Sequence, residues 1–226
     1  METKDLLKHN TVFGCMPERD LDTLLERAHM RQYHKGQYLT HTGDNWPFIF
    51  FLLKGSITAV KESLEGRSFV ATSFQPGEVF WGVSFFDPKL AMPVALKVDL
   101  QTSVLLWSRE QILPAILENG HVAWELSCLM ISRMLRASEI LEELAFQPVA
   151  GRLAKLLIDF PGGTTGGPIA RSLTLDDMAA RIGTTREMVC RLLQRFADQE
   201  LIKITRTEFE ITDLDRLTIM MQKVRG

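Results

Sequence analysis

The sequence predicts an α+β fold in which an antiparallel sandwich or roll precedes one long helix and a C-terminal helix-turn-helix. Three observations predict it: short β-rich runs between Arg31 and Trp107, an uninterrupted helical pattern from about Asn119 to Phe146, and two short helices joined at Gly183. The 226 residues, of which 46% are hydrophobic and 24% charged, suit one large or two small globular domains.

The N-terminal part of the chain is predicted to begin with a helix and to continue as strands. Apolar residues recur at steps of three and four between Pro17 and Ala28, which is the pattern of an amphipathic helix. Glycines then separate short runs rich in β-branched and aromatic residues, as expected of an antiparallel sandwich or roll. The predicted strands are Phe48–Leu53, Ile57–Lys61, Ser68–Phe74 and Val104–Trp107.

The long helix carries an apolar seam with alternating steps of four and three residues, the spacing of a coiled coil. Such a seam can face the core of its own subunit or a second copy of the chain. We expect the second arrangement, a homodimer, because a helix of about 25 residues is longer than a small domain usually contains. The predicted interface residues are Ala123, Ser127, Met130, Met134, Ala137, Leu141 and Leu144.

Two short helices with a glycine turn are predicted after this helix. Thr174 is the expected N-cap of the first helix, Gly183 ends it, and Thr184 or Thr185 caps the second. A β-hairpin should follow, as in the wing of a winged helix. The inward face of the second helix is Met188 or Val189, Leu192, Leu193 and Phe196, and the hairpin strands are Ile202–Thr205 and Phe209–Thr212.

The outward face of the second helix is predicted to read DNA. Arg186, Glu187, Cys190 and Arg191 stand at positions i, i+1, i+4 and i+5, so they share one side near its N-terminal end. A recognition helix inserts this end into the major groove, where Arg bonds guanine and Glu accepts from cytosine. Basic residues outnumber acidic ones from Ala145 onward, whereas the whole chain has a net charge of −2. The predicted DNA-contacting residues are Thr184, Thr185, Arg186, Glu187, Cys190 and Arg191.

The chain resembles the CRP/FNR superfamily of bacterial transcription regulators from about residue 12 to residue 220. The resemblance implies a cyclic-nucleotide-binding-like β-roll effector domain over residues 1–118, a dimerisation helix over 119–146 and a winged helix-turn-helix over 147–226. It also implies a homodimer on an inverted-repeat operator with TGTGA-like half-sites, and contact with RNA polymerase if the protein is an activator. Its motifs are Gly43-Asp44, Ile49–Gly55, Gly77-Glu78-Val79-Phe80, the long helix and Gly183–Arg191.

Two branches of that superfamily do not match these residues. Members that bind cyclic AMP hold it with a Gly-Glu pair and an Arg-Ser pair, whereas this chain has Trp81-Gly82 and Met92-Pro93 at the corresponding positions. A phosphate next to Met92 would be buried without a charge partner. Members with an iron–sulfur cluster need four cysteine ligands, and the chain has only Cys15, Cys128 and Cys190.

An apolar pocket in the roll is the predicted effector site, with a small molecule other than a cyclic nucleotide as its ligand. Its residues are Phe80, Trp81, Phe85, Met92, Val94, Met130 and Met134, unless these side chains simply form the core. The alternative that the sequence leaves open is a regulator without an effector, as in some members of the superfamily. A haem- or redox-dependent sensor of the same fold stays open, because the chain has conceivable axial ligands. These are His29, His34, His41, His121, Met30 and Met92. No metal site and no other cofactor is expected.

Several other classes of protein are not favoured. The sequence shows no Ser/His/Asp or metal-binding constellation, so an enzyme is not expected. No apolar run reaches the ~18–20 residues that span a bilayer, and Met1–Asn10 shows no secretory signal, which favours a cytoplasmic protein without membrane contact. Residues 161–168 (PGGTTGGP) lack the Lys-Ser/Thr of a phosphate-binding loop and are expected to be a flexible connection. A cyclic-nucleotide-domain-like regulatory subunit that does not bind DNA remains the alternative.

Overall fold

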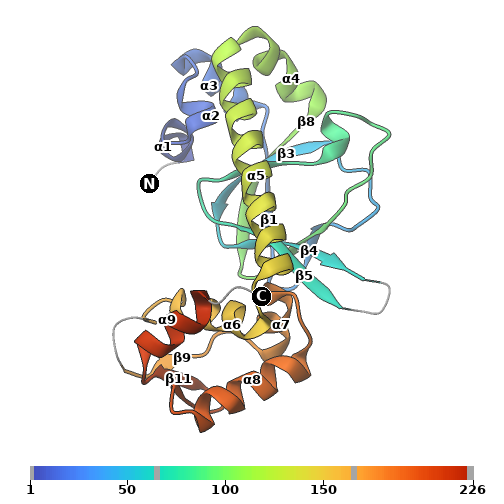
Figure 1. Ribbon diagram of the computed structural model, residues 1–226. Coiled ribbons are helices and arrows are strands. Elements are labelled where there is room, and N and C mark those ends of the chain that lie inside the picture. Colours follow the sequence, from blue (N-terminus) through green and yellow to red (C-terminus); the bar gives the residue numbers. More distant parts are fainter. Residues whose placement is uncertain (1–2, 64–66, 164–166, 223–226) are drawn as a thin grey trace. The chain divides into compact units, whose positions relative to one another are not determined.

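The computed structural model describes residues 3–63, 67–163 and 167–222, and the chain divides into two compact units (Figure 1). The first unit contains Met1–Lys61 and Ala71–Leu135, and the second contains Glu62–Val70 and Arg136–Gly226. The helix α5, Gly120–Phe146, is continuous across the division, and its bounds confirm the long helix that the sequence predicts. The side chain of Asn119 caps it by accepting from the backbone N–H groups of His121 and Val122.

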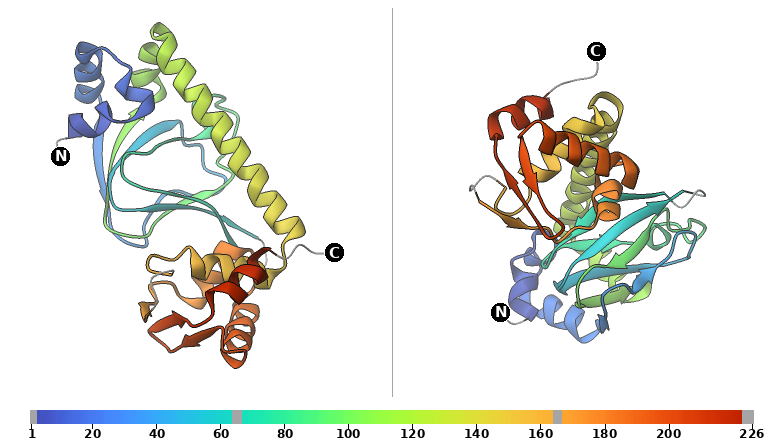
Figure 2. Two further views of the ribbon diagram at one scale, coloured as in Figure 1. Left: turned by 60° about the vertical axis from the view of Figure 1, so that its left-hand side comes forward. Right: turned by 90° about the horizontal axis from the view of Figure 1, so that it is seen from below.

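The strands of the first unit form two four-stranded sheets, whose ribbons curve around a common interior in Figure 2. All four predicted strands are present, and the pairings between strands are antiparallel. One sheet has the order β1 (His29–Tyr33), β8 (Thr102–Ser108), β3 (Phe48–Lys54) and β6 (Val79–Trp81). The other has the order β2 (Tyr38–Thr40), β7 (Ala95–Val98), β4 (Ile57–Glu62) and β5 (Ser68–Phe74).

Strand β3 is apolar on both faces because each face packs against a different layer. Phe50 and Leu52 belong to a cluster with side chains of β4, β7 and β8, which fills the space between the sheets. Ile49 and Phe51 point the other way and pack with the helices that cover the sheet. The alternation follows from the two-residue period of a strand, and burial on both sides accounts for the continuous run FIFFLL.

Helices cover the outer face of the sheet that contains β3. The predicted helix at Pro17–Ala28 is confirmed as α3, Glu18–Glu26, and its backbone carbonyl at Leu24 accepts a 2.7 Å hydrogen bond from the indole of Trp107. The sequence did not predict α4, which has Pro114 inside it and a weak apolar period. The remaining helices of this layer are α1 (Thr3–Lys8), α2 (Thr11–Gly14), α4 (Arg109–Glu118) and the 3₁₀ turn η1 (Val83–Phe85).

The second unit is a winged helix-turn-helix around its own core. The hairpin β10–β11 confirms the predicted wing with ends shifted by one residue, and β9 adds a third strand to it. The Gly-rich segment 161–168 that we expected to be a flexible connection lies partly outside the described residues, at 164–166. The elements are α6 (Val149–Ile158), β9 (Ile169–Ala170), α7 (Leu175–Ile182), α8 (Arg186–Asp198), β10 (Ile202–Ile204), β11 (Glu208–Ile211) and α9 (Leu214–Gln222). Among the described residues, no helix is long and apolar enough to cross a membrane.

Candidate functional site

The helix α8 is held by a buried apolar face and a defined N-cap. Of the two threonines proposed as its cap, Thr185 is the one in place, since its hydroxyl accepts from the Met188 N–H at 3.3 Å. Val189, rather than Met188, lies fully inside the core, together with three other predicted residues. These are Leu192, Leu193 and Phe196. Burial of this face fixes the rotation of α8 about its axis.

The opposite face of α8 presents the predicted DNA-contacting side chains to solvent. Arg186, Glu187, Cys190 and Arg191 are all exposed. Arg191 donates a weak hydrogen bond to the sulfur of Met188 at 3.8 Å, and the charge of Glu187 also acts on it. The pKa of Glu187 is lowered by its own backbone N–H and then by the Thr185 hydroxyl, so this carboxylate stays charged. One anionic and two cationic groups therefore lie together near the N-terminal end of α8, the end with which recognition helices enter the major groove.

Arg186 differs from Arg191 because it already has an acidic partner. Its Nη1 lies 3.5 Å from Oδ2 of Asp176, in the first turn of α7, and both side chains are mostly exposed. An exposed ion pair of this kind contributes about 0–1 kcal/mol. If Arg186 contacts a base, its ion pair with Asp176 is lost, and with it this small contribution.

The turn between α7 and α8 is fixed by a glycine and by a buried arginine. Gly183 has φ 64° and ψ 51°, the left-handed conformation that a side chain disfavours. Arg152 of α6 is buried and donates from Nε to the Ile182 carbonyl at 2.8 Å and from Nη1 to the Gln147 carbonyl at 2.7 Å. Its cation thus satisfies the carbonyl end of α7, which stabilises the turn that positions α8.

Two further basic residues, which the sequence analysis did not single out, lie beside Arg186. Arg171, before α7, and Arg206, in the wing, line with Arg186 a cavity of about 390 Å³ at the N-terminal end of α7. Asp176 is the acidic residue in the lining. Three guanidinium groups next to a helix N-terminus favour an anion, which suits a DNA phosphate. Only the fold brings these separated arginines together.

The predicted dimer seam on α5 is largely solvent-exposed in the single chain. Met130, Met134 and Leu141 are 45%, 65% and 67% exposed. Ser127 and Ala137 are also exposed, whereas Ala123 and Leu144 are half-buried. Large apolar side chains beside the seam are similarly uncovered: Trp124, Ile131, Leu135 and Phe146. A row of exposed apolar residues along one helix is typical of an interface.

The predicted effector residues belong to different parts of the first unit. Trp81 and Phe85 belong to the cluster between the sheet and its helices. Met92 is buried in the interior between the sheets, with Phe80 and Val94 packed against that cluster. Met130 and Met134 are exposed and belong to neither cluster. Most of these side chains therefore form core, the second of the two readings that the sequence left open.

A half-buried arginine next to Phe80 and Trp81 has no counterpart in the sequence analysis. Arg133 of α5 lies over the rings of Phe74, Phe80 and Trp81, with 5.0, 5.4 and 5.3 Å between its guanidinium carbon and the ring centroids. Its Nη2 donates to the Val79 carbonyl at 2.6 Å. Burial lowers the pKa of this guanidinium, although it stays far above neutrality.

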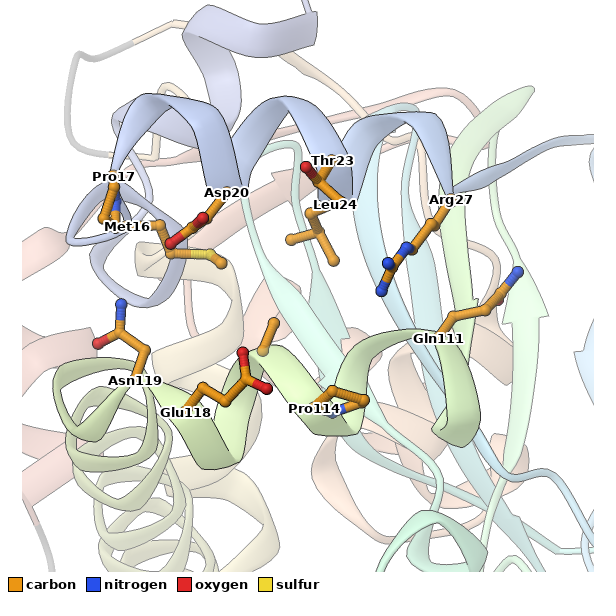
Figure 3. Close-up of a pocket in the computed structure, with 11 residues that line it drawn as sticks. Met16, Pro17, Asp20, Thr23, Leu24, Arg27, Gln111, Pro114, Glu118 and Asn119 are labelled. Carbon is orange, nitrogen blue, oxygen red and sulfur yellow. The ribbon is translucent and has the colours of Figure 1, made fainter.

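Two of the cavities that described residues line lie on the first unit. One, of about 390 Å³, is a groove between α3 and α4 into which Asp20, Arg27 and Glu118 project (Figure 3). None of the predicted effector residues lines it.

The second cavity, of about 580 Å³, is lined by His29 and His41 together with polar side chains of β1 and β2. His29 is hydrogen-bonded to Gln111 at 3.1 Å, and the ring of His41 stacks on Tyr38. The lining of this cavity is mixed, because Trp46, Phe48 and Leu106 lie beside its polar groups. No group of three or more potential metal ligands occurs in the described part of the chain.

Comparison with known families matches both units. Residues 30–119 match the model of the cyclic nucleotide-binding domain, and residues 151–219 match the model of the Crp-like helix-turn-helix domain. The cAMP-activated global transcriptional regulator Vfr of Pseudomonas aeruginosa is 25% identical over 195 residues, which cover 82% of this chain and 90% of that protein. The cAMP-activated regulator CRP of Escherichia coli is 24% identical over 192 residues, covering 82% and 91%.

Solved structures show the same fold. A transcriptional regulator from Eubacterium rectale, described as belonging to the crp/fnr family, superposes with a TM-score of 0.78 at 17% identity, covering 94% of this chain and 98% of that one. The c-di-GMP responsive global regulator CLP of Xanthomonas campestris gives a TM-score of 0.74 at 19% identity, covering 86% and 99%. By their names, Vfr and CRP are activated by cAMP and CLP responds to c-di-GMP, so the shared fold does not specify an effector.

Proposed function

Since the chain is a CRP/FNR-type DNA-binding transcription regulator, we propose that it binds an inverted-repeat operator as a homodimer and reads each half-site with α8. The observation that carries the proposal is the placement of Arg186, Glu187 and Arg191 on the exposed side of a helix whose other side is buried. Cys190 lies among them and approaches the same groove. Arg191 contacts guanine, and Glu187 accepts from cytosine.

The phosphate backbone is held by groups around this reading helix. Thr184 and Thr185 lie at the N-terminal end of α8, where backbone N–H groups also point outward. Arg171 and Arg206 add two cations that line the cavity at the α7 N-terminus. These contacts orient α8 and carry no sequence information, whereas the side chains of α8 supply it.

The dimer is formed by α5. Seven large apolar side chains on this helix are between 45% and 67% exposed, and a second copy of the same helix would cover them. Two-fold symmetry then places the two α8 helices about one turn of DNA apart, ~34 Å, so the half-sites form an inverted repeat. The resemblance to the superfamily suggests TGTGA-like half-sites and, for an activator, contact with RNA polymerase in the cytoplasm.

The effector is a small molecule other than cyclic AMP. Met92 and Pro93 stand where a phosphate would need a cation, and Met92 is buried among apolar side chains. A buried phosphate without a charge partner there would be strongly disfavoured. Isothermal titration calorimetry with cyclic AMP should therefore give no heat of binding, and a micromolar dissociation constant would contradict this part of the proposal.

Selection from a random duplex pool tests the DNA-binding function. The purified full-length protein is incubated with the pool, and the retained duplexes are sequenced over several rounds. We expect an inverted repeat with half-sites about one helical turn apart. Enrichment of no motif, or of a single asymmetric site, would overturn the proposal. The matched control is the same chain with Arg186, Glu187 and Arg191 replaced by alanine, which should retain no common sequence.

A further inference from the structure

Arg133 occupies a cage made of three aromatic rings and one carbonyl. The rings of Phe74, Phe80 and Trp81 lie 5.0–5.4 Å from its guanidinium carbon, within the ~6 Å over which a cation is attracted to a ring face. The Val79 carbonyl accepts from Nη2 at 2.6 Å. A cage of aromatic faces is the arrangement with which proteins recognise weakly hydrated organic cations.

The cage holds its cation incompletely. Nε of Arg133 is buried and has no hydrogen-bond partner among the described residues. No ion pair joins the guanidinium to a carboxylate in the part of the chain that the structure describes, and Glu78 acts on it only through its charge. Leaving a buried donor without a hydrogen bond is unfavourable. A cation that turned all its N–H groups toward acceptors or solvent would therefore bind in the cage without this unsatisfied donor.

We propose that this cage is the effector site of the regulator, that it takes a monosubstituted guanidinium compound, and that Arg133 is an internal occupant which the effector displaces. This inference rests on the proposed function, since it names the ligand class for the effector-responsive domain. A guanidinium can lie against the rings and donate to Val79 in the way that Nη2 does. A free ligand can also turn so that its remaining N–H groups reach solvent.

The surroundings favour a cation over an anion. Ring faces carry the negative part of the aromatic quadrupole, so three faces turned to one point repel an anion. The carbonyl of Val79 accepts hydrogen bonds and cannot donate one. The negative charge of Glu78 lies close enough to stabilise the positive form of Arg133. An anion bound at Nε would be repelled by the ring faces, by the Val79 carbonyl oxygen and by the charge of Glu78.

Displacement of Arg133 acts directly on α5. Arg133 precedes Met134, which belongs to the proposed dimer seam. While its guanidinium is in the cage, this part of α5 is tied to β5 and β6. An effector in the cage releases that tie and frees the helix to repack against its partner. The effector can shift the equilibrium toward the released helix only by as much as it binds that state more tightly than the state with Arg133 in the cage.

Calorimetric titration with ethylguanidinium chloride, at millimolar or lower concentration, tests the proposal. The proteins are the wild type, Arg133→Ala, and the matched control Arg136→Ala, which removes an exposed arginine three residues further along α5. Removing the internal competitor should strengthen ethylguanidinium binding by at least about tenfold, because a tethered group competes at an effective millimolar concentration. Arg136→Ala should bind like the wild type. Adding Phe80→Ala to Arg133→Ala should abolish the gain.

Two further measurements keep the result unambiguous. Arg133→Lys retains a tethered cation, so it should bind ethylguanidinium more weakly than Arg133→Ala, and it replaces that variant if the alanine protein does not fold. Equal affinity in the wild type and Arg133→Ala would overturn the proposal. Benzoate binding to the wild type that is lost in Arg133→Ala would also overturn it, in favour of an anion site at Nε. Selection of operator DNA by the wild type is measured separately, so failure of the cage leaves the DNA-binding function standing.

Discussion

Replacing Arg191 by alanine should remove sequence reading at one base pair of each half-site without affecting the fold. The side chain is exposed, and its contact within the protein is the sulfur of Met188 at 3.8 Å. Exposed substitutions away from structural features change the free energy of unfolding by about 0.5 kcal/mol or less. Almost the whole effect should therefore fall on DNA binding.

The expected loss follows from the number of contacts. One bidentate arginine–guanine contact contributes about 1–3 kcal/mol of discrimination. This corresponds to a roughly 5–150-fold weaker complex for each half-site. A symmetric operator contains two such contacts, so the loss for the complete site is about 2–6 kcal/mol if they act independently.

Arg186→Ala should weaken binding by less than Arg191→Ala if both arginines make equal base contacts. Arg186 gives up its 3.5 Å ion pair with Asp176 when it turns to DNA, so about 0–1 kcal/mol of its base contact is offset. Asp176→Asn removes this competition and should strengthen operator binding slightly.

Fluorescence anisotropy with labelled duplexes measures these losses. The duplexes are the selected operator, versions with one substituted base pair in each half-site, and an unrelated sequence. Arg19→Ala, on an exposed position of α3, serves as the control for the loss of one positive charge. Arg191→Ala should bind the operator and one substituted version equally. Weakening by the same factor on every sequence would refute the reasoning, since it would make Arg191 a phosphate contact.

Two other substitutions and one chemical modification test the dimer seam, the exposed face of α8 and the turn before it. Met134→Asp should weaken dimerisation by more than about 100-fold, because it buries an unpaired carboxylate in the apolar seam; a sedimentation profile identical to the wild type would contradict the seam. Alkylation of Cys190, in a chain whose other two cysteines are serine, should lower operator affinity because it adds bulk on the exposed face of α8; Cys190→Ser should be insensitive, and unchanged affinity after full alkylation would show that this face does not approach DNA. Gly183→Ala should lower the stability of the second unit by about 1–2 kcal/mol, since φ is 64° and the new methyl would lie 2.7 Å from Leu144; an unchanged melting temperature would rule out strain at the turn.

The elements that the sequence predicted are those whose local pattern agrees with their packing. The helix-turn-helix was predicted because Thr174, Gly183 and the apolar face of α8 all act within a few residues of one another. The four long strands were predicted because they are rich in β-branched and aromatic residues. The short strands β1 and β2 are largely polar or exposed, so no period marks them. Their place in the sheets depends on partners far along the chain.

The candidate site divides in the same way. Arg186, Glu187, Cys190 and Arg191 lie on one helix, and the 3.6-residue period alone places them on one face. Arg171 and Arg206 could not be predicted, because only the pairing of β9 with β11 brings them near α7.

Arg133 was missed for a related reason. Its position on α5 is one residue away from the apolar seam, which by itself suggests an exposed charge. Its burial depends on the rings of β5 and β6, more than 50 residues earlier in the chain. The same dependence separates Met92 from Trp81, which the sequence placed in one pocket and the structure places in two clusters.

Sedimentation velocity of the protein with its selected operator tests the central claim most directly. The wild type is mixed at micromolar concentration with the complete inverted repeat and, separately, with a duplex that contains one half-site. The account predicts a dimer in the absence of DNA, one dimer on each complete site, and much weaker binding to the single half-site. A monomer that binds the single half-site as tightly as the complete repeat would contradict it.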